Sequence, residues 1–189
     1  MKSNTFKEYI APVVVLVCIC LVITAALAVT YGVTNPIIIK NSKATADKTR
    51  TELLSTADTF TQYKGKLVVE EAKAVYVQDV YTSNNGAGMV VTVVTKSFGG
   101  ALTMMVGINN QGEITGVKIM SHSDTPGLGT KNMTTSYLGQ YKGLTKMNST
   151  NVKNDGQIKY ITGASVTGSA VHYGVYCALD QYNKMGGVK

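Results

Sequence analysis

The most pronounced pattern in the chain is a long apolar segment close to its first residue. Between Tyr9 and Ile39 the sequence contains no Asp, Glu, Lys, Arg or His. A helix needs about 20 apolar residues to cross the hydrocarbon core of a membrane, and this segment is longer. Pro12 falls in the first turn, where a missing backbone N–H is tolerated. The pattern predicts one transmembrane helix over residues 9–34, preceded by a tail over residues 1–8.

A cleaved signal peptide is the alternative interpretation of this segment. Lys2 and Lys7 would form its basic start, and Ala26-Leu27-Ala28 resembles a small-residue cleavage site. The apolar stretch is longer than an ordinary signal-peptide core and continues past Ala28, which favours a retained helix.

Orientation across the membrane does not follow from counting charges, because basic residues flank both ends of the apolar segment. They are Lys2 and Lys7 before it, and Lys40, Lys43, Lys48 and Arg50 after it. Long domains cross the membrane largely regardless of their charge. We therefore expect a single-pass protein of the cell (inner) membrane, with residues 1–8 as a cytoplasmic tail and the soluble domain on the extracytoplasmic side.

Several segments after residue 66 have the pattern of β-strands. They are rich in β-branched residues and are separated by turns that contain Asn and Gly. Strands are expected within residues 67–80 and over 89–95, 101–108 and 113–120, with turns at 83–86 and 109–112. Short turns between successive strands favour an antiparallel sheet.

Helical patterns lie on both sides of these strands. Polar residues with interspersed Ala and Leu predict a helical stalk over residues 35–66 that leads out of the membrane. Apolar residues at helical spacing predict a helix over residues 165–185 that packs on the sheet. The expected fold class is α+β, an antiparallel sheet with packed helices over residues 67–189, preceded by one N-terminal transmembrane helix.

Composition excludes several classes of function. The chain has 189 residues, of which 44% are apolar and 15% charged, and a formal net charge of +7. Its lysines are scattered singly and Arg50 is the only arginine, so no nucleic acid partner is expected. The only histidines are His122 and His172, and Cys177 is the only cysteine outside the apolar segment. No metal site is expected, and catalytic triads and P-loops are absent from the sequence.

A short segment at the start of the predicted C-terminal helix, Thr162-Gly163-Ala164-Ser165, has the pattern of an anion site. Thr162 is a credible N-cap, with its side-chain oxygen facing the N–H of Ser165. Free backbone N–H groups and the positive end of the helix dipole favour a phosphate at such a position. An ordinary capped helix accounts for the local pattern as well.

A second segment follows the last predicted strand and reads His122-Ser123-Asp124-Thr125-Pro126-Gly127-Leu128-Gly129-Thr130-Lys131. Two glycines around an apolar residue let the backbone approach a planar ligand closely. A surface turn is the alternative, because Thr-Pro-Gly by itself favours a turn.

Together these segments resemble the FMN-binding domain shared by the G subunit of the Rnf complex and the C subunit of the sodium-pumping NADH:quinone reductase. The similarity covers nearly the whole chain, including the single N-terminal helix. In that family, FMN is bonded through its phosphate to the last hydroxyl of a Ser/Thr-Gly-Ala-Thr/Ser motif, and a His-x-Glu-Thr-Pro-Gly-x-Gly-like loop lies at the flavin. The resemblance implies covalent FMN on Ser165.

The resemblance also implies a set of cofactor-binding residues. They are Ser165, Thr162, Gly163, Ala164 and Thr167 in one segment, and His122, Asp124, Thr125, Pro126, Gly127, Leu128, Gly129 and Lys131 in the other. Two positions depart from the family pattern. Lys159 stands where the family usually has Asp, and Ser165 stands where it usually has Thr.

The implied role is that of a membrane-anchored component of an Rnf-type ion-translocating ferredoxin:NAD+ oxidoreductase. The protein would relay single electrons through FMN and have no complete active site on its own. Its implied partners are the other subunits of the Rnf-type membrane complex, the membrane, and a flavin transferase during maturation. The alternatives are the C subunit of the sodium-pumping reductase, a stand-alone extracytoplasmic flavin shuttle, and a tethered structural domain without a cofactor.

Overall fold

The computed structural model of the chain describes residues 9–188. Helix α1 (Ala11–Leu53) contains the apolar segment, and among the described residues it is the one helix long and apolar enough to cross a membrane. The chain divides into two compact units between Thr45 and Ala46, so the last residues of α1 belong to the C-terminal unit.

The helical stalk is shorter than the sequence pattern predicted. Helix α1 ends at Leu53, and strand β1 (Phe60–Gln62) occupies part of the range expected to be helical. Strand β1 pairs with β3 (Val75–Ser83), with Phe60 opposite Ser83. Because backbone pairing with a remote strand outweighs weak local helix propensity, the boundary follows the sheet and not the local pattern.

The C-terminal unit is built on an antiparallel sheet. Strands β3, β4 (Gly88–Ser97), β5 (Gly100–Asn109) and β6 (Ile114–Ser121) lie side by side in chain order, and β2 (Val69–Glu70) pairs with β3 as β1 does. The turns that join β3 to β4 and β5 to β6 contain Gly86 and Gly112, both with positive φ. The predicted antiparallel α+β fold is confirmed.

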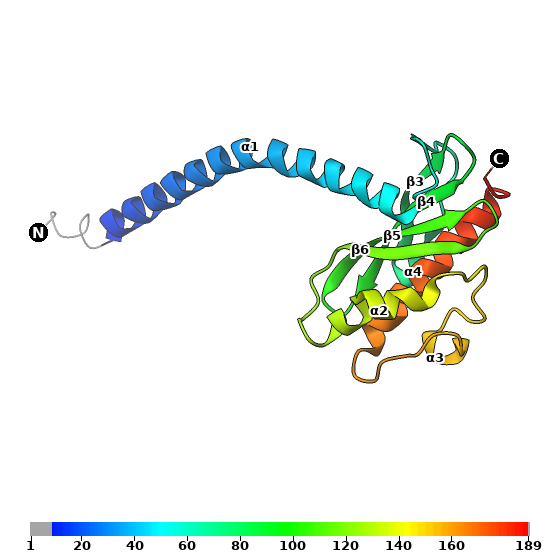
Figure 1. Ribbon diagram of the computed structural model, residues 1–189. Coiled ribbons are helices and arrows are strands. Elements are labelled where there is room, and N and C mark those ends of the chain that lie inside the picture. Colours follow the sequence, from blue (N-terminus) through cyan, green and yellow to red (C-terminus); the bar gives the residue numbers. More distant parts are fainter. Residues whose placement is uncertain (1–8, 189) are drawn as a thin grey trace, which may run out of the picture. The chain divides into compact units, whose positions relative to one another are not determined.

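Helix α4 (Ser165–Lys184) packs across one face of this sheet (Figure 1). Its buried side chains, such as Val171 and Val175, join Val93 and Met104 in the main core. Short helices α2 (Thr135–Leu138) and α3 (Val152–Asp155) and the 3-10 turns η2 (Glu71–Lys73), η3 (Gly129–Met133) and η4 (Gly139–Tyr141) complete the unit. The predicted C-terminal helix is therefore present and covers the sheet.

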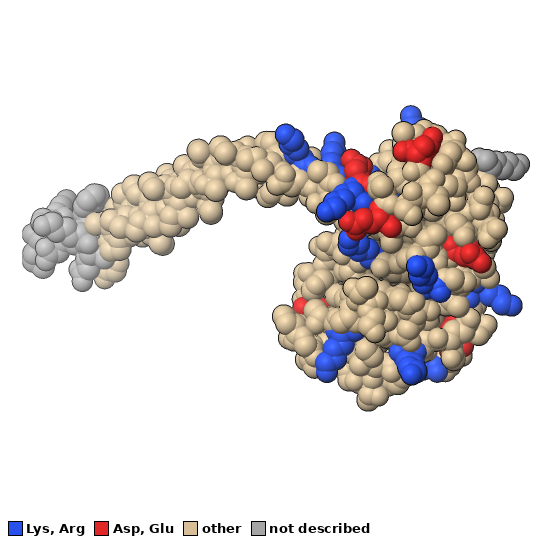
Figure 2. All heavy atoms as spheres, in the orientation of Figure 1, with Lys and Arg blue, Asp and Glu red and all other residues tan. Residues whose placement is uncertain are grey.

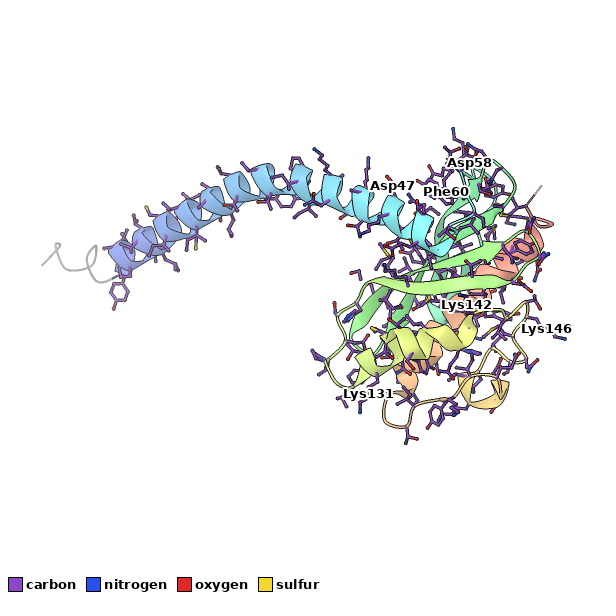
Figure 3. All side chains as sticks on the ribbon, in the orientation of Figure 1. Asp47, Asp58, Phe60, Lys131, Lys142 and Lys146 are labelled. Carbon is purple, nitrogen blue, oxygen red and sulfur yellow. The ribbon has the colours of Figure 1, made fainter. Side chains whose placement is uncertain are left out.

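The last turns of α1 pack on the opposite face of the sheet. Leu54 is buried with Val90 and Met105, and Phe60 packs beside them (Figure 3). The guanidinium carbon of Arg50 lies 3.6 Å from the centre of the Tyr81 ring. This cation–π contact and the apolar contacts fix residues 46–54 to the domain.

Charged side chains are spread over the surface of the C-terminal unit. On the face drawn in Figure 2, lysines stand singly or beside acidic residues. Three lysines of this unit form ion pairs among the described residues: Lys48 and Lys118 with Glu52, and Lys184 with Asp180.

Candidate functional site

The two segments singled out in the sequence meet at one pocket. A cavity of about 250 Å³ is lined by Asp124, Thr125, Leu128 and Gly129 from the loop after β6, by residues 163–167 at the start of α4, and by Phe98. We call this cavity the Ser165 pocket. The antiparallel order of the strands brings the loop after β6 to the end of the sheet where α4 begins.

Asp124 ties three segments of this pocket together. Its Oδ1 accepts a hydrogen bond from Thr167 Oγ1 at 2.8 Å and from the backbone N–H of Gly99 at 3.1 Å. The side chain is only 5% exposed. These bonds join the β4–β5 turn, the loop after β6 and the first turn of α4.

The second carboxylate oxygen of Asp124 has no hydrogen-bond donor among the described residues. The Ser97 hydroxyl lies close to the carboxylate, and its oxygen is 3.1 Å from the carbonyl oxygen of Gly100. Burial raises the pKa of Asp124, but the polar groups of Ser97, Thr167 and Gly99 outweigh that effect and hold it below its usual value. The lining of the pocket therefore includes a buried, ionised carboxylate.

Asn132 also joins the two motif segments, and the sequence analysis did not predict this role. Its Nδ2 donates to the carbonyl of Ala164 at 3.0 Å and to that of Gly129 at 3.4 Å, and the side chain is fully buried. The two carbonyls belong to the two motif segments. Nothing in the sequence distinguishes Asn132 from the other asparagines, because its role depends on the path of the chain around it.

The start of α4 is open to an anion. The N-cap residue is Ala164, which supplies no side-chain hydrogen bond, and the first intrahelical bond runs from the N–H of Gly168 to the carbonyl of Ala164. Within the described chain, the backbone N–H groups of residues 165–167 have no acceptor. Such free donors, at the positive end of a 20-residue helix, suit a phosphate.

The prediction that Thr162 caps this helix is wrong. Gly163 adopts a φ of 83°, and the turn that it forms leaves Thr162 exposed and outside the lining of the Ser165 pocket. A left-handed residue directly before the N-cap redirects the chain, so the hydroxyl two residues upstream does not reach the first N–H groups.

The structure brings eight of the sequence-predicted site residues into the lining of the pocket. These are Asp124, Thr125, Leu128, Gly129, Gly163, Ala164, Ser165 and Thr167. The others do not line it and are exposed: Thr162, His122, Pro126, Gly127 and Lys131. Two lining residues were not predicted, Phe98 and Val166, and both are exposed, Phe98 by 78%.

The residues present fit a phosphate-linked flavin. The half-buried hydroxyl of Ser165 stands beside free N–H groups, Phe98 and Leu128 offer apolar surface for a flat ring, and Asp124 offers an acceptor for an N–H or O–H group. Ligand pockets usually measure about 300–1,000 Å³. At about 250 Å³ the Ser165 pocket is smaller, so a flavin extends beyond it.

Comparison with known proteins gives the family. Residues 97–180 match the family described as FMN-binding domain. The chain is 30% identical over 176 residues to the G subunit of the proton-translocating ferredoxin:NAD(+) oxidoreductase complex of Clostridium ljungdahlii, covering 90% of this chain and 89% of the relative. It is 30% identical over 184 residues to the G subunit of an ion-translocating oxidoreductase complex of Methanosarcina acetivorans, covering 96% and 98%.

Among solved structures, NqrC of Shewanella oneidensis aligns with a TM-score of 0.45 and 18% identity, over 57% of this chain and 58% of that one. The sequence relatives carry the assignment, because they match along almost their whole length. The chain belongs to the family of G subunits of Rnf-type ion-translocating oxidoreductase complexes, as an electron-transfer component with an FMN-binding domain.

Proposed function

We propose that this protein carries FMN as a phosphoester on Ser165 and relays single electrons within an Rnf-type ion-translocating ferredoxin:NAD+ oxidoreductase. One observation carries the proposal. The Ser165 hydroxyl lies at the uncapped start of α4, in the pocket where the two motif segments converge. A serine in that place has free N–H donors beside it that stabilise the charge of a phosphate group.

The attachment requires an activated FMN donor, of the phosphoanhydride class, and a flavin transferase. Ser165 Oγ loses its proton and bonds to phosphorus, while the bond from that phosphorus to the donor's bridging oxygen breaks. The released phosphate group takes up the electron pair of the broken bond, and the hydroxyl proton passes to a base of the transferase. The chain gains the mass of FMN less that of water.

The protein tunes such a cofactor through its surroundings. Attachment through the phosphate leaves the flavin ring unmodified, and FMN supplies one-electron chemistry when bound. Asp124 would be a hydrogen-bond acceptor for the bound cofactor, while Phe98 and Leu128 would offer apolar surface to its ring. Thr167 and Asn132 position the two segments that form the pocket.

Intact mass and in-gel flavin fluorescence test the attachment, on the full chain co-produced with a flavin transferase and then denatured. Ser165→Ala abolishes the mass gain and the fluorescence. Ser136→Ala, at an exposed position of α2, is the matched control and keeps both. A fluorescent Ser165→Ala band, or a colourless wild-type chain that binds no added FMN, would refute the proposal.

We further propose that α1 anchors the protein in the cell membrane with its domain on the extracytoplasmic side. The long apolar helix supports the anchor. Lys146 is exposed on the domain (Figure 3), so Lys146→Cys provides a site for a membrane-impermeant maleimide. Labelling in intact cells supports this orientation, and labelling only after lysis opposes it. The unsubstituted chain reports background from Cys18, Cys20 and Cys177.

Membership in a complex is tested by recovery of partners. Tagged chain extracted from its own membranes in mild detergent should bring down the other Rnf-type subunits in equal amounts. Recovery of sodium-pumping quinone reductase subunits instead would favour the C-subunit alternative. Recovery of the chain alone would favour a stand-alone shuttle if the chain carries flavin, and a tethered structural domain if it does not.

A further inference from the structure

A second cavity adjoins the Ser165 pocket across the start of α4. It measures about 670 Å³, and Ser165 and Val166 line both cavities. Three lysines line it, Lys73, Lys96 and Lys153, and no acidic residue of the described chain does. We call it the basic cavity.

Each lysine of the basic cavity comes from a different element. Lys73 ends η2, Lys96 lies near the end of β4, and Lys153 lies in α3. None of the three forms an ion pair with another described residue. Two are held by aromatic rings, with Lys73 Nζ 3.9 Å from the Tyr173 ring centre and Lys153 Nζ 5.2 Å from that of Tyr160. Like charges that converge on one cavity repel each other, and an anion between them removes that cost.

The other side of the helix start has the opposite charge. Asp124 is nine-tenths or more buried, and it is the one acidic residue of the described chain that lines the Ser165 pocket. A phosphate placed beside that carboxylate would be repelled, whereas the N–H and O–H groups of a flavin ring and its sugar-alcohol chain would find an acceptor. The lining is therefore negatively charged on the Asp124 side of Ser165 and positively charged on the side of the three lysines.

We infer that the basic cavity holds the phosphate of the flavin bonded to Ser165, with Lys73, Lys96 and Lys153 facing its charged oxygens, while the ring lies toward Asp124. This inference rests on the proposed function and adds an orientation to it. It also accounts for the small size of the Ser165 pocket, since the flavin spans both cavities. The uncapped N–H groups of residues 165–167 stand between them.

The test compares FMN with riboflavin, which lacks the phosphate. Full-length Ser165→Ala in detergent is titrated with each flavin by fluorescence quenching. Converting Lys73, Lys96 and Lys153 together to Gln should weaken FMN binding roughly tenfold or more, because charge-assisted contacts to phosphate are lost. Riboflavin binding should not change. Converting Lys64, Lys142 and Lys146 to Gln is the charge-matched control and should affect neither flavin.

Two further measurements keep the inference separate from the attachment itself. Asp124→Asn should weaken FMN and riboflavin alike, because it acts on the part that they share. In the flavinylated chain with Ser165 intact, the ³¹P resonance of the phosphodiester should move in the lysine variant and stay in the control. An unmoved resonance, or equal loss of both flavins in the lysine variant, overturns the inference. A chain that acquires no flavin mass refutes the proposed function instead.

Competition with inorganic phosphate shows whether the basic cavity is filled by the phosphate of the bound flavin or binds a separate anion. Inorganic phosphate should weaken FMN binding to Ser165→Ala. It should bind the flavinylated chain no more tightly than it binds the flavinylated lysine variant. Saturable phosphate binding to the flavinylated chain, lost in the lysine variant, would show that the basic cavity serves a separate anion and would overturn the inference.

Discussion

Thr167 Oγ1 donates a hydrogen bond to Asp124 Oδ1 across 2.8 Å, although the two residues are 43 positions apart in the sequence. Both side chains are buried. The bond joins the first turn of α4 to the loop after β6, and so it holds the two sides of the Ser165 pocket together. A buried charge-assisted bond of this kind is expected to matter both for stability and for the shape of the site.

Thr167→Val preserves the shape of this side chain and removes the donor. We expect the free energy of unfolding to fall by about 1–3 kcal/mol at neutral pH, since a buried carboxylate loses one partner. The pKa of Asp124 in the folded chain lies below 3.8, its value in the unfolded chain, so the ionised form stabilises the fold above pH 3.8. That stabilisation is lost as the pH falls through the folded pKa. The difference between wild type and variant, measured by urea unfolding, should shrink below pH 3.8; a constant difference would contradict this account.

Asn132→Asp tests the hydrogen bonds that join the two motif segments. The substitution keeps the size of the side chain but turns an amide donor into an acceptor that faces the carbonyls of Ala164 and Gly129. Loss of the buried bonds should cost about 1–3 kcal/mol of unfolding free energy and lower the flavinylated fraction. Asn154→Asp, at an exposed position, is the control and should do neither. Unfolding in urea and intact mass measure the two effects.

His172→Phe should remove a pH dependence of stability. The ring is fully buried, with Nε2 donating to the carbonyl of Ser149 at 2.8 Å and lying 3.6 Å from Asp155 Oδ2, while Nδ1 faces the Tyr141 hydroxyl at 3.4 Å. Burial lowers the pKa of His172 more than Ser149 and Asp155 raise it, so the folded value lies below 6.5. As the pH falls, His172 therefore binds a proton at a higher pH in the unfolded chain than in the folded chain.

In wild type, the free energy of unfolding should consequently decrease as the pH falls below 6.5, and in His172→Phe that slope should disappear, although the variant is less stable overall. Asp155 does not interfere, because its folded pKa lies below 3.8. His122→Gln, at an exposed position, should keep the slope. Urea midpoints measured above and below pH 6.5 test this prediction. An unchanged slope in His172→Phe would count against a buried neutral histidine.

Phe98→Ala separates flavin contact from folding. The ring is 78% exposed yet lines the Ser165 pocket, so its removal should leave unfolding unchanged. Stacking between aromatic rings contributes about 0.5–1.5 kcal/mol, and non-covalent FMN binding to Ser165→Ala should weaken by that amount. Tyr76→Ala, at another exposed aromatic, should have no effect on FMN. Equal FMN affinity with and without the Phe98 ring would place the flavin elsewhere.

Local patterns in the sequence predicted the elements of this fold well. The uncharged apolar run, the β-branched strands with their Asn- and Gly-containing turns, and the apolar stripe of α4 each report on a single element, whose periodicity depends only on neighbouring residues. The family resemblance rested on two short motifs, and the relatives confirm it. The end of α1 at Leu53 and the helix start at Ala164 differed from prediction, because sheet pairing and the turn at Gly163 decide them.

The sequence by itself therefore determined the class of the fold, the long apolar helix near the N-terminus, the family and the position of Ser165 at a helix start. Only the tertiary structure decided that Asp124 meets Thr167, that Asn132 joins the two motif segments, that Phe98 lines their pocket and that three lysines face a cavity behind Ser165. The physical reason is that burial and hydrogen bonding between residues far apart depend on the path of the whole chain, which no local periodicity encodes.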